Sequence, residues 1–526
     1  MSAELIIAAD FGTTGVKLGA VDRDFRLIAW TREPYPLAVD AARGAAEQNP
    51  QDWWDAAARG VARLSARLPG LREAAGALVL CAQMCGVVCT DASGAPLRPC
   101  LIWLDKRAGP AARRLVGGLP SYEGYALAKL ARWLPLANGA PSLNGADPPA
   151  KMQWLRESEP DTWRSTDKLL DVRDWLVLRA TGRAVTTYDC ANLTWMMDSR
   201  AGRVGWSAPL MRLVGVDRAR LPDIVDGSAI VGGLRAGAAR ELGLREGLPV
   251  VAGSGDVCAS ALGSGAVDDG ALHIHIGTSS WVGGFFPSRR LSVANHFATI
   301  ASAAGARPLL IATQETAGEC LNWAARAFGA DAPGGDAIAA LISAAQACQP
   351  GAQDPLFLPW LAGERMPIDD ERLRGGFLGL SLAHDRRHLA RAVLEGIALN
   401  LRWALEYVAR QRGAHAGAHA GAHDGAMPVV GTVAGDPFFV QLLADVLQRP
   451  LQMLADPACA GVLGASTFAA TALGWAASPW EVARRCAHKA ALIVPDGGRV
   501  DFYVGRLAKL KDAWRRTAPW FRKAMA

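Results

Sequence analysis

The sequence predicts an α/β protein whose two related halves face each other across a cleft. Short apolar segments alternate with amphipathic helical patterns, which is typical of α/β folds. An apolar run that leads into a Gly-Thr turn and a hairpin occurs near residue 10 and again near residue 277. Two copies of one such unit would place a glycine-rich turn on each side of a cleft. The length of 526 residues leaves room for two to four domains at roughly 100 to 200 residues each.

The first half begins with a short apolar run that is consistent with a buried strand, followed by a glycine-bearing turn. Two further apolar runs are separated by a polar turn and predict a hairpin. Asn49 and Pro50 offer an N-cap and a first-turn proline for a helix. The expected elements are strands at 5–9, 16–21 and 27–30, a helix at 50–68 and a strand at 77–85.

The second half begins in the same way. The expected elements are strands at 272–276, 281–286, 297–301 and 308–312 and a helix at 319–328. Asp385 is expected to cap a helix that runs through Leu405, with Gly413 just past its end, and Asp436 and Pro437 to begin another. Residues 117–149, rich in Gly, Pro, Asn and Ser, predict an irregular excursion, and residues 475–526 predict closing helices.

Composition argues against several classes of function. The net charge is only +6 and the basic residues are dispersed, so no nucleic-acid partner is expected. The N-terminus lacks the basic start of a secretory signal. No segment approaches the ~18 apolar residues of a membrane span. We therefore expect a cytoplasmic protein with no membrane partner, and a symmetric dimer as the commonest assembly of soluble enzymes.

Two repeated patterns carry alternative interpretations. Cys81, Cys85 and Cys89 recur every four residues, and packing in a buried segment is favoured over metal binding. Three histidines at the same spacing in residues 413–423 favour a surface insertion over a metal site, because the interleaved glycines oppose a stable helix.

Two strand ends carry residues suited to phosphoryl transfer. The turn at 12–15 offers backbone N–H groups and hydroxyls to phosphate oxygens, and Asp10 before it could bind Mg²⁺. Asp256 follows the apolar strand at 248–252 and could accept the proton of an attacking hydroxyl. Each pattern alone is compatible with an ordinary polar turn, and their occurrence in both halves favours a phosphate site.

In combination, the motifs resemble the FGGY family of carbohydrate kinases, and among its members most the xylulokinases. The likeness extends from Asp10 to about Leu473. The segments that carry it are 10–17, 83–86, 101–105, 148–155, 253–256, 276–279, 357–365, 375–380, 388–389 and 392–395.

This resemblance implies two RNase H-like domains of the actin and hexokinase superfamily flanking a central cleft. Residues 1–252 would hold the sugar and the first phosphate loop, and residues 253–526 the catalytic aspartate, the second phosphate loop and the adenine site. The implied reaction is ATP-dependent and Mg²⁺-dependent phosphorylation of a hydroxyl of a small sugar or polyol.

The resemblance also assigns roles residue by residue. Asp256 would act as the catalytic base, and Asp10 as a catalytic residue and the metal ligand. The implied substrate-binding residues are Gln83, Met84, Cys85, Trp103, Asp256 and Val257. The implied nucleotide-binding residues are Gly12, Thr13, Thr14, Lys17, Gly277, Thr278, Ser279, Gly431, Gly435 and Asp436.

The sequence departs from the xylulokinase pattern at three places. Cys85 and Val257 stand where that pattern has His and Asn, so two hydroxyl-pairing groups are missing and a different or less hydroxylated substrate is expected. Thr432 and Val433 replace glycines of the adenine loop, where added side chains restrict backbone approach.

Two other classes of function compete with the kinase. A non-catalytic regulatory relative that binds a sugar or nucleotide is the main one, and the presence of both Asp10 and Asp256 favours the enzyme. A heat-shock-like ATPase or actin-like filament protein would need further segments that the sequence after Leu473 is too short to supply.

Overall fold

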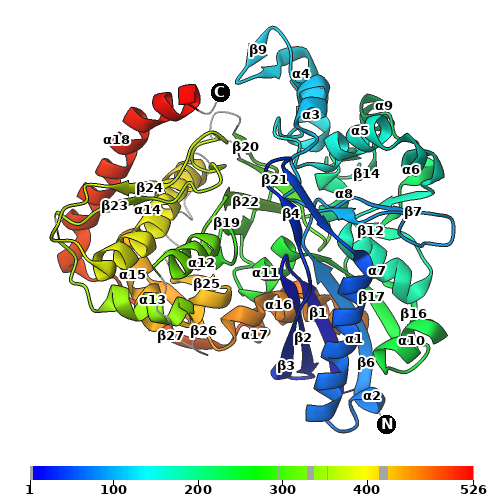
Figure 1. Cartoon of the computed structure of the whole chain (residues 1–526). Helices are drawn as coiled ribbons and strands as arrows, with labels where there is room; N and C mark the ends of the chain where they lie inside the picture. The colour runs from blue at the N-terminus through cyan, green and yellow to red at the C-terminus, as the bar shows by residue number, and fades with distance from the viewer. Residues whose placement is uncertain (1–3, 293–296, 329–336, 352, 414–424, 525–526) are drawn as a thin grey trace.

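The computed structural model describes residues 4–292, 297–328, 337–351, 353–413 and 425–524. Two mixed sheets dominate the molecule and lie in two lobes side by side (Figure 1). The histidine repeat predicted as a surface insertion lies, apart from Gly413, outside the described residues.

The first sheet has six strands in the order β16-β17-β6-β1-β2-β3. Strand β1 pairs antiparallel with β2 and parallel with β6, which in turn pairs parallel with β17. The predicted strand and hairpin are therefore confirmed. The bounds are β1 Leu5–Phe11, β2 Gly15–Asp22, β3 Leu27–Pro34, β6 Ala75–Ala82, β16 Ile230–Gly233 and β17 Pro249–Gly255.

The second sheet has eight strands in the order β20-β21-β22-β19-β18-β25-β26-β27. Its strands β22, β19, β18, β25, β26 and β27 have the same order and the same relative directions as β3, β2, β1, β6, β17 and β16. The internal repeat predicted from the two Gly-Thr turns is confirmed. The bounds are β18 His273–Ile276, β19 Ser280–Phe285, β20 Leu291–Ser292, β21 Phe297–Ala301, β22 Pro308–Gln314, β25 Met427–Val430, β26 Leu451–Leu454 and β27 Lys489–Ile493.

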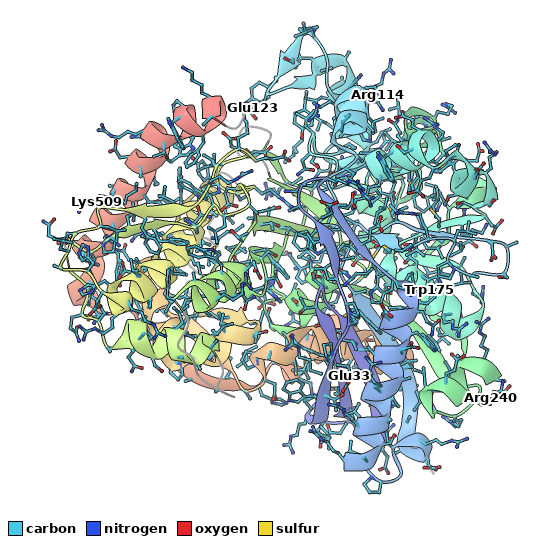
Figure 2. The ribbon with its side chains drawn as sticks, in the orientation of Figure 1. Glu33, Arg114, Glu123, Trp175, Arg240 and Lys509 are labelled. Carbon is cyan, nitrogen blue, oxygen red and sulfur yellow. The ribbon has the colours of Figure 1, made fainter. Side chains whose placement is uncertain are left out.

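Helices cover both faces of the first sheet. Its outer face packs on α1 (Pro50–Arg67), α7 (Val172–Thr181) and α10 (Ala236–Leu242), in one apolar cluster. Asn49 caps α1 by accepting from the Gln51 N–H, as predicted. In the edge strand β3, the buried Glu33 pairs with Arg63 of α1 at 3.0 Å. Glu33 is labelled in Figure 2.

A layer of three helices lies between the two sheets. It contains α11 (Asp256–Gly263), α16 (Ala460–Ala472) and α17 (Pro479–Cys486), whose apolar residues form one cluster with residues of both sheets. The helices α11 and α16 touch closely, since a Cβ at Gly464 would lie 1.7 Å from the Ala259 carbonyl oxygen. The two halves of the chain therefore share part of their core.

The outer face of the second sheet packs on a further helical cluster. Asp436 caps α15 as predicted, because its side chain accepts from the Phe439 N–H at 2.9 Å. The helix predicted after Asp385 is also present and ends at Gly413. The helices are α12 Gly318–Ala327, α13 Ala337–Gln346, α14 Arg386–Gly413, α15 Pro437–Leu447 and α18 Val500–Ala524.

One sequence expectation about a connecting segment was wrong, and another was incomplete. Residues 117–149 are not mostly irregular but contain a small hairpin and α4 (Leu127–Ala137), which forms because Leu130 and Trp133 give it a buried face. The C-terminal region holds the expected helices but also the edge strand β27.

The remaining elements are short and connect or extend these layers. They are β4 Ala38–Asp40, β5 Ala45–Gln48, α2 Leu71–Ala74, β7 Val88–Thr90, β8 Cys100–Leu101, α3 Gly109–Val116, β9 Ser121–Tyr122, β10 Tyr125–Ala126, α5 Pro148–Ser158, α6 Pro160–Ser165, β11 Lys168–Leu170, β12 Val185–Thr187, α8 Tyr188–Leu193, β13 Met197–Asp198, β14 Gly205–Trp206, α9 Ala208–Val214, β15 Asp223–Val225, β23 Leu356–Leu358 and β24 Gly376–Leu378. Within the described ranges, no helix combines the length and apolar character that crossing a membrane requires.

Candidate active site

Asp10 and Asp256 lie at the same edge of the first sheet. Asp10 is near the carboxyl end of β1, and Asp256 directly follows β17 as the first residue of α11. Strand β6 separates them, and its Cys81 is in register with Asp10 on one side and with Ser254 on the other. The two acidic groups that the sequence singled out are thus brought together across one strand.

The charges of the two carboxylates act on each other. Burial, and then the charge of Asp10, raises the pKa of Asp256 to about 8. Burial also raises the pKa of Asp10, which Lys17 and the Cys81 thiol partly oppose. Two partly buried acids that repel each other favour a shared proton or a bound cation.

The first glycine-threonine turn is held by side chains from distant parts of the chain. Gly12 accepts the Tyr35 hydroxyl, and the Thr13 carbonyl accepts Gln48 Nε2 at 2.8 Å. The Thr13 hydroxyl accepts from Trp103 Nε1 at 3.0 Å. The turn that is predicted to bind phosphate is therefore hydrogen-bonded to Trp103, a predicted substrate-binding residue.

The turn after β6 carries three of the predicted substrate residues. Gln83 donates to Gln48 Oε1 at 2.7 Å and is buried. Met84 packs on Gly255, where a Cβ would lie 2.3 Å from its sulfur atom. The turn is thus linked through Gln48 to Thr13 of the first phosphate loop, and it contacts the residue that precedes Asp256.

Cys85 has an unusual backbone conformation, with φ of 63°. Its N–H donates to Asp171 at 3.1 Å, and its carbonyl accepts from the buried Lys151 ammonium at 2.9 Å. Cys85 and Val257 both pack, partly exposed, on the apolar layer between the sheets. Neither side chain therefore offers a strong hydrogen-bond partner where it is exposed.

The second Gly-Thr turn joins β18 to β19, at the place in the repeat that the first turn occupies. The carbonyls of Gly277 and Thr278 accept from backbone N–H groups at the start of α12, at 2.9 to 3.1 Å. A Cβ at Gly318 would lie 2.2 Å from the Gly277 carbonyl oxygen, so this approach requires glycine. Ser279, like these two loop residues, is partly exposed.

The predicted adenine loop follows β25. Gly431 has φ of 107°, and a Cβ there would lie 2.1 Å from the Ile276 carbonyl oxygen. Val433 is buried in the core and Thr432 is exposed, so the Val433 side chain does not project over the surface of this loop. Gly435 is exposed, and the Asp436 side chain caps α15.

Lys17 was predicted to bind nucleotide, and its ammonium donates to the Ala458 carbonyl at 2.7 Å. This contact joins the hairpin of the first half to a turn of the second half. A role toward phosphate therefore stays a prediction.

Three contributors to the site were not among the predicted residues. Gln48 binds Thr13 and Gln83, Asp189 accepts the Gly255 N–H at 2.8 Å, and Glu315 pairs with Lys106 at 3.0 Å. Each partner lies at least 35 residues away in the sequence. No local motif could have indicated these contacts.

The residues around Asp10 are better suited to bind a divalent cation together with a nucleotide than to bind a metal ion with protein ligands alone. No group of three or more His, Cys, Asp or Glu residues suited to holding a metal occurs in the part of the chain that the structure describes. Cys81 and Cys89 are buried and Cys85 is partly buried, in agreement with the packing interpretation. Gly461 leaves space at the Asp10 carboxylate, since a Cβ there would lie 2.3 Å from Oδ2. Mg²⁺ typically takes one or two carboxylates and completes its shell with phosphate oxygens and water.

Comparison with protein families gives this arrangement a context. Residues 5–263 match the N-terminal domain, and residues 272–473 the C-terminal domain, of the FGGY family of carbohydrate kinases. The chain is 30% identical over 475 residues to the xylulose kinase of Escherichia coli strain K12, an alignment covering 88% of this chain and 89% of that one. It is 25% identical over 402 residues to a gluconokinase of Bacillus subtilis, an alignment covering 75% of each chain. The chain belongs to the FGGY family of carbohydrate kinases.

Solved structures agree on the fold. A ligand-bound xylulose kinase from Lactobacillus acidophilus superposes with a TM-score of 0.83 at 22% identity, covering 99% of both chains. A Plasmodium falciparum glycerol kinase with ADP gives 0.78 at 16% identity, covering 97% of this chain and 98% of that one. The protein is thus an enzyme that transfers a phosphoryl group from ATP to a sugar, and the expected two-lobed α/β fold of these kinases is confirmed.

Proposed function

We propose that the protein phosphorylates D-xylulose, or a related ketose or polyol, converting D-xylulose and ATP to D-xylulose 5-phosphate and ADP. One observation carries this proposal: Asp10 and Asp256 share one sheet edge, next to the loop anchored by Trp103. The curated relatives named xylulose kinase support the choice of sugar.

In the proposed reaction, the sugar hydroxyl oxygen attacks the γ-phosphorus while Asp256 accepts the hydroxyl proton. The bond from the γ-phosphorus to the bridging oxygen breaks, and ADP leaves. A raised pKa suits Asp256 to this task, because a base is most effective when its pKa lies near the working pH. The two glycine-threonine turns and the loop that begins at Gly431 would hold the nucleotide.

Asp10 is the residue that would hold Mg²⁺. When bound, the ion supplies charge neutralisation to the β- and γ-phosphate oxygens. Asp10 would orient it, directly or through water, and would at the same time be relieved of its repulsion with Asp256.

The substrate pocket differs from one built to pair every hydroxyl. Cys85 offers only a weak thiol donor and Val257 offers none. Without these pairing groups, the site loses its preference for a sugar that carries hydroxyls at the corresponding positions. The preferred substrate is therefore expected to have fewer hydroxyls there, or to carry them at other positions.

The test is an ADP-release assay with ketopentoses, ketohexoses, polyols and gluconate, comparing the wild type with Asp256→Ala. We expect at least one sugar to raise ADP release in the wild type alone. If no sugar does so while sugars and nucleotides still bind, the chain is a non-catalytic binding protein instead.

Two further properties belong to this proposal. A cytoplasmic location fits the use of ATP and ten cysteines that are all free thiols. A homodimer remains the expected assembly. Fractionation and light scattering test these properties.

A further inference from the structure

Glu315 is the first residue after β22, and its side chain joins two separate parts of the molecule. Its Oε1 lies 3.0 Å from Lys106 Nζ, and its Oε2 lies 2.8 Å from Arg365 Nη2. The Glu315 side chain is only 7% exposed. Burial would raise its pKa, but Arg365 and Lys106 hold the pKa of Glu315 below its ordinary value, so the carboxylate stays ionised.

The backbone next to Glu315 supports the second phosphate loop. The Glu315 N–H donates to Oε1 of the buried Glu364 at 2.8 Å. Two and three residues later, the chain donates N–H groups to the carbonyls of Thr278 and Gly277 at 3.1 and 2.9 Å. The segment that begins at Glu315 is therefore bound to this loop by two backbone hydrogen bonds.

Lys106 belongs to the segment that anchors the first phosphate loop. Three residues before it, Trp103 donates to the Thr13 hydroxyl, and the Lys106 N–H itself donates to the Gly44 carbonyl at 2.8 Å. The ion pair between Lys106 and Glu315 thus connects the supports of both phosphate loops, one from each half of the chain.

The second cationic partner, Arg365, directly follows Glu364 in the chain. Its guanidinium lies 2.8 Å from the Glu315 carboxylate, and the charges of Glu315 and Asp147 raise the pKa of Arg365. The Glu315 carboxylate therefore contacts one cation from the first-loop segment and one from the segment that accepts its own N–H.

We propose that Glu315 is a positioning residue that fixes the spacing of the two phosphate loops, so that the γ-phosphoryl group reaches the sugar hydroxyl rather than water. The inference rests on the proposed sugar kinase function. Positioning matters here because phosphoryl transfer depends almost entirely on alignment and charge neutralisation, and small misplacements are costly. Transfer to water would yield ADP and inorganic phosphate, and transfer to the sugar would yield ADP and the sugar phosphate.

The test compares Glu315→Gln and Lys106→Met with the wild type, using the sugar that gives the highest ADP release. We expect kcat to fall about tenfold or more in each variant, as for a misaligned reactive group. We also expect the ratio of ADP to sugar phosphate to rise above that of the wild type. Lys106→Arg, which keeps the charge, should restore both values in large part. The double variant should lose little more than Glu315→Gln alone, since that change already removes the contact with Lys106.

Glu395→Gln is the matched control. Glu395 is also a buried carboxylate with two cationic partners, Arg391 and Arg506, each at 3.0 Å, but all three lie within the second lobe. Its loss should lower the melting temperature and leave the product ratio at the wild-type value.

The inference fails if Glu315→Gln and Lys106→Met behave like Glu395→Gln, with lower stability but a wild-type ratio and kcat. Lys106 is 27% exposed, so Lys106→Met should fold even if Glu315→Gln does not. In that case, the kcat and the product ratio of Lys106→Met test the inference. Absence of sugar-dependent ADP release in the wild type would instead count against the proposed function.

Discussion

At the scale of single residues, the buried position of Asp256 raises its affinity for a proton. The same position lowers the stability of the folded chain when Asp256 is ionised. Burial and the neighbouring charge of Asp10 raise its pKa to about 8, well above the ordinary value of 3.8. The folded chain therefore binds a proton more tightly than the unfolded chain. The free energy of unfolding falls as the pH rises from about 4 to about 8. A residue kept at this cost is expected to serve the reaction.

Asp256→Asn should separate these two effects. We expect kcat to drop by about 10²- to 10⁴-fold, the usual contribution of a general base. The melting temperature should exceed that of the wild type at pH 8 and approach it near pH 4, because the variant lacks the ionised carboxylate. Thermal unfolding across this pH range, with kinetics on the same samples, checks both. Equal melting temperatures at pH 8 would mean that the Asp256 charge is well solvated.

The substrate preference should respond to Cys85→His combined with Val257→Asn. These changes add one hydroxyl-pairing group directly after Asp256 in the chain and one in the predicted sugar-contact turn. Histidine is among the residues that tolerate the positive φ of 63° at position 85. We expect kcat/KM for D-xylulose to rise about tenfold or more relative to the best wild-type substrate. The KM for ATP should not change. An unchanged substrate profile would place both residues outside the pocket.

At the scale of elements, the loop after β25 depends on one glycine. Gly431→Ala would force a Cβ to within 2.1 Å of the Ile276 carbonyl oxygen, next to the second phosphate loop. We expect the KM for ATP to rise about tenfold or more, because the loop must shift away from its position. Gly425→Ala, before β25, is the control, since its Cβ would meet nothing within 4 Å and Gly425 is not among the predicted nucleotide-binding residues. Equal nucleotide affinity in the two variants would contradict the role of this loop.

The sequence predicted elements with strong local signals and missed those that depend on distant contacts. Strand β1, its Gly-Thr turn and the caps Asn49 and Asp436 are local patterns, and all were found. Helix α4 was missed because its signal is two buried residues, Leu130 and Trp133, within a segment rich in turn formers.

The candidate site divides in the same way. Asp10 and Asp256 end apolar strands, so their placement could be predicted. Gln48 and Glu315 act through partners far away in the chain, and nothing in their neighbours indicates those contacts. The backbone strain at Cys85 was also invisible, because Asp171 and Lys151 impose it from 66 to 86 residues away.

At the scale of the whole molecule, the repeat explains why the site lies where it does. The two sheets have corresponding strands in corresponding directions, so their Gly-Thr turns occupy equivalent places. The helices that follow β17 and β26, α11 and α16, pack against each other at glycine contacts. A duplicated unit with a shared helical layer thus sets the loops of one half opposite those of the other.

This shared layer should make the halves depend on each other for folding. The division after residue 252 remains a prediction, and residues 1–252 alone would lack α11 and α16. One face of the first sheet would then expose apolar side chains that the full chain buries completely, among them Ile6, Val79 and Val251. At about 25 cal/mol per Å² of apolar surface, losing this cover is a large fraction of the stability of a domain.

We therefore expect residues 1–252 to bind a hydrophobic dye and to lack a cooperative thermal transition, whereas the full chain unfolds in a single transition. In the full chain, Gly464→Ala should lower the melting temperature of both lobes together, because its Cβ would lie 1.7 Å from the Ala259 carbonyl oxygen. Gly505→Ala, whose Cβ meets nothing within 4 Å, is the control. Calorimetry distinguishes the outcomes: a fragment that melts cooperatively near the temperature of the full chain would mean that each lobe holds a sufficient core of its own.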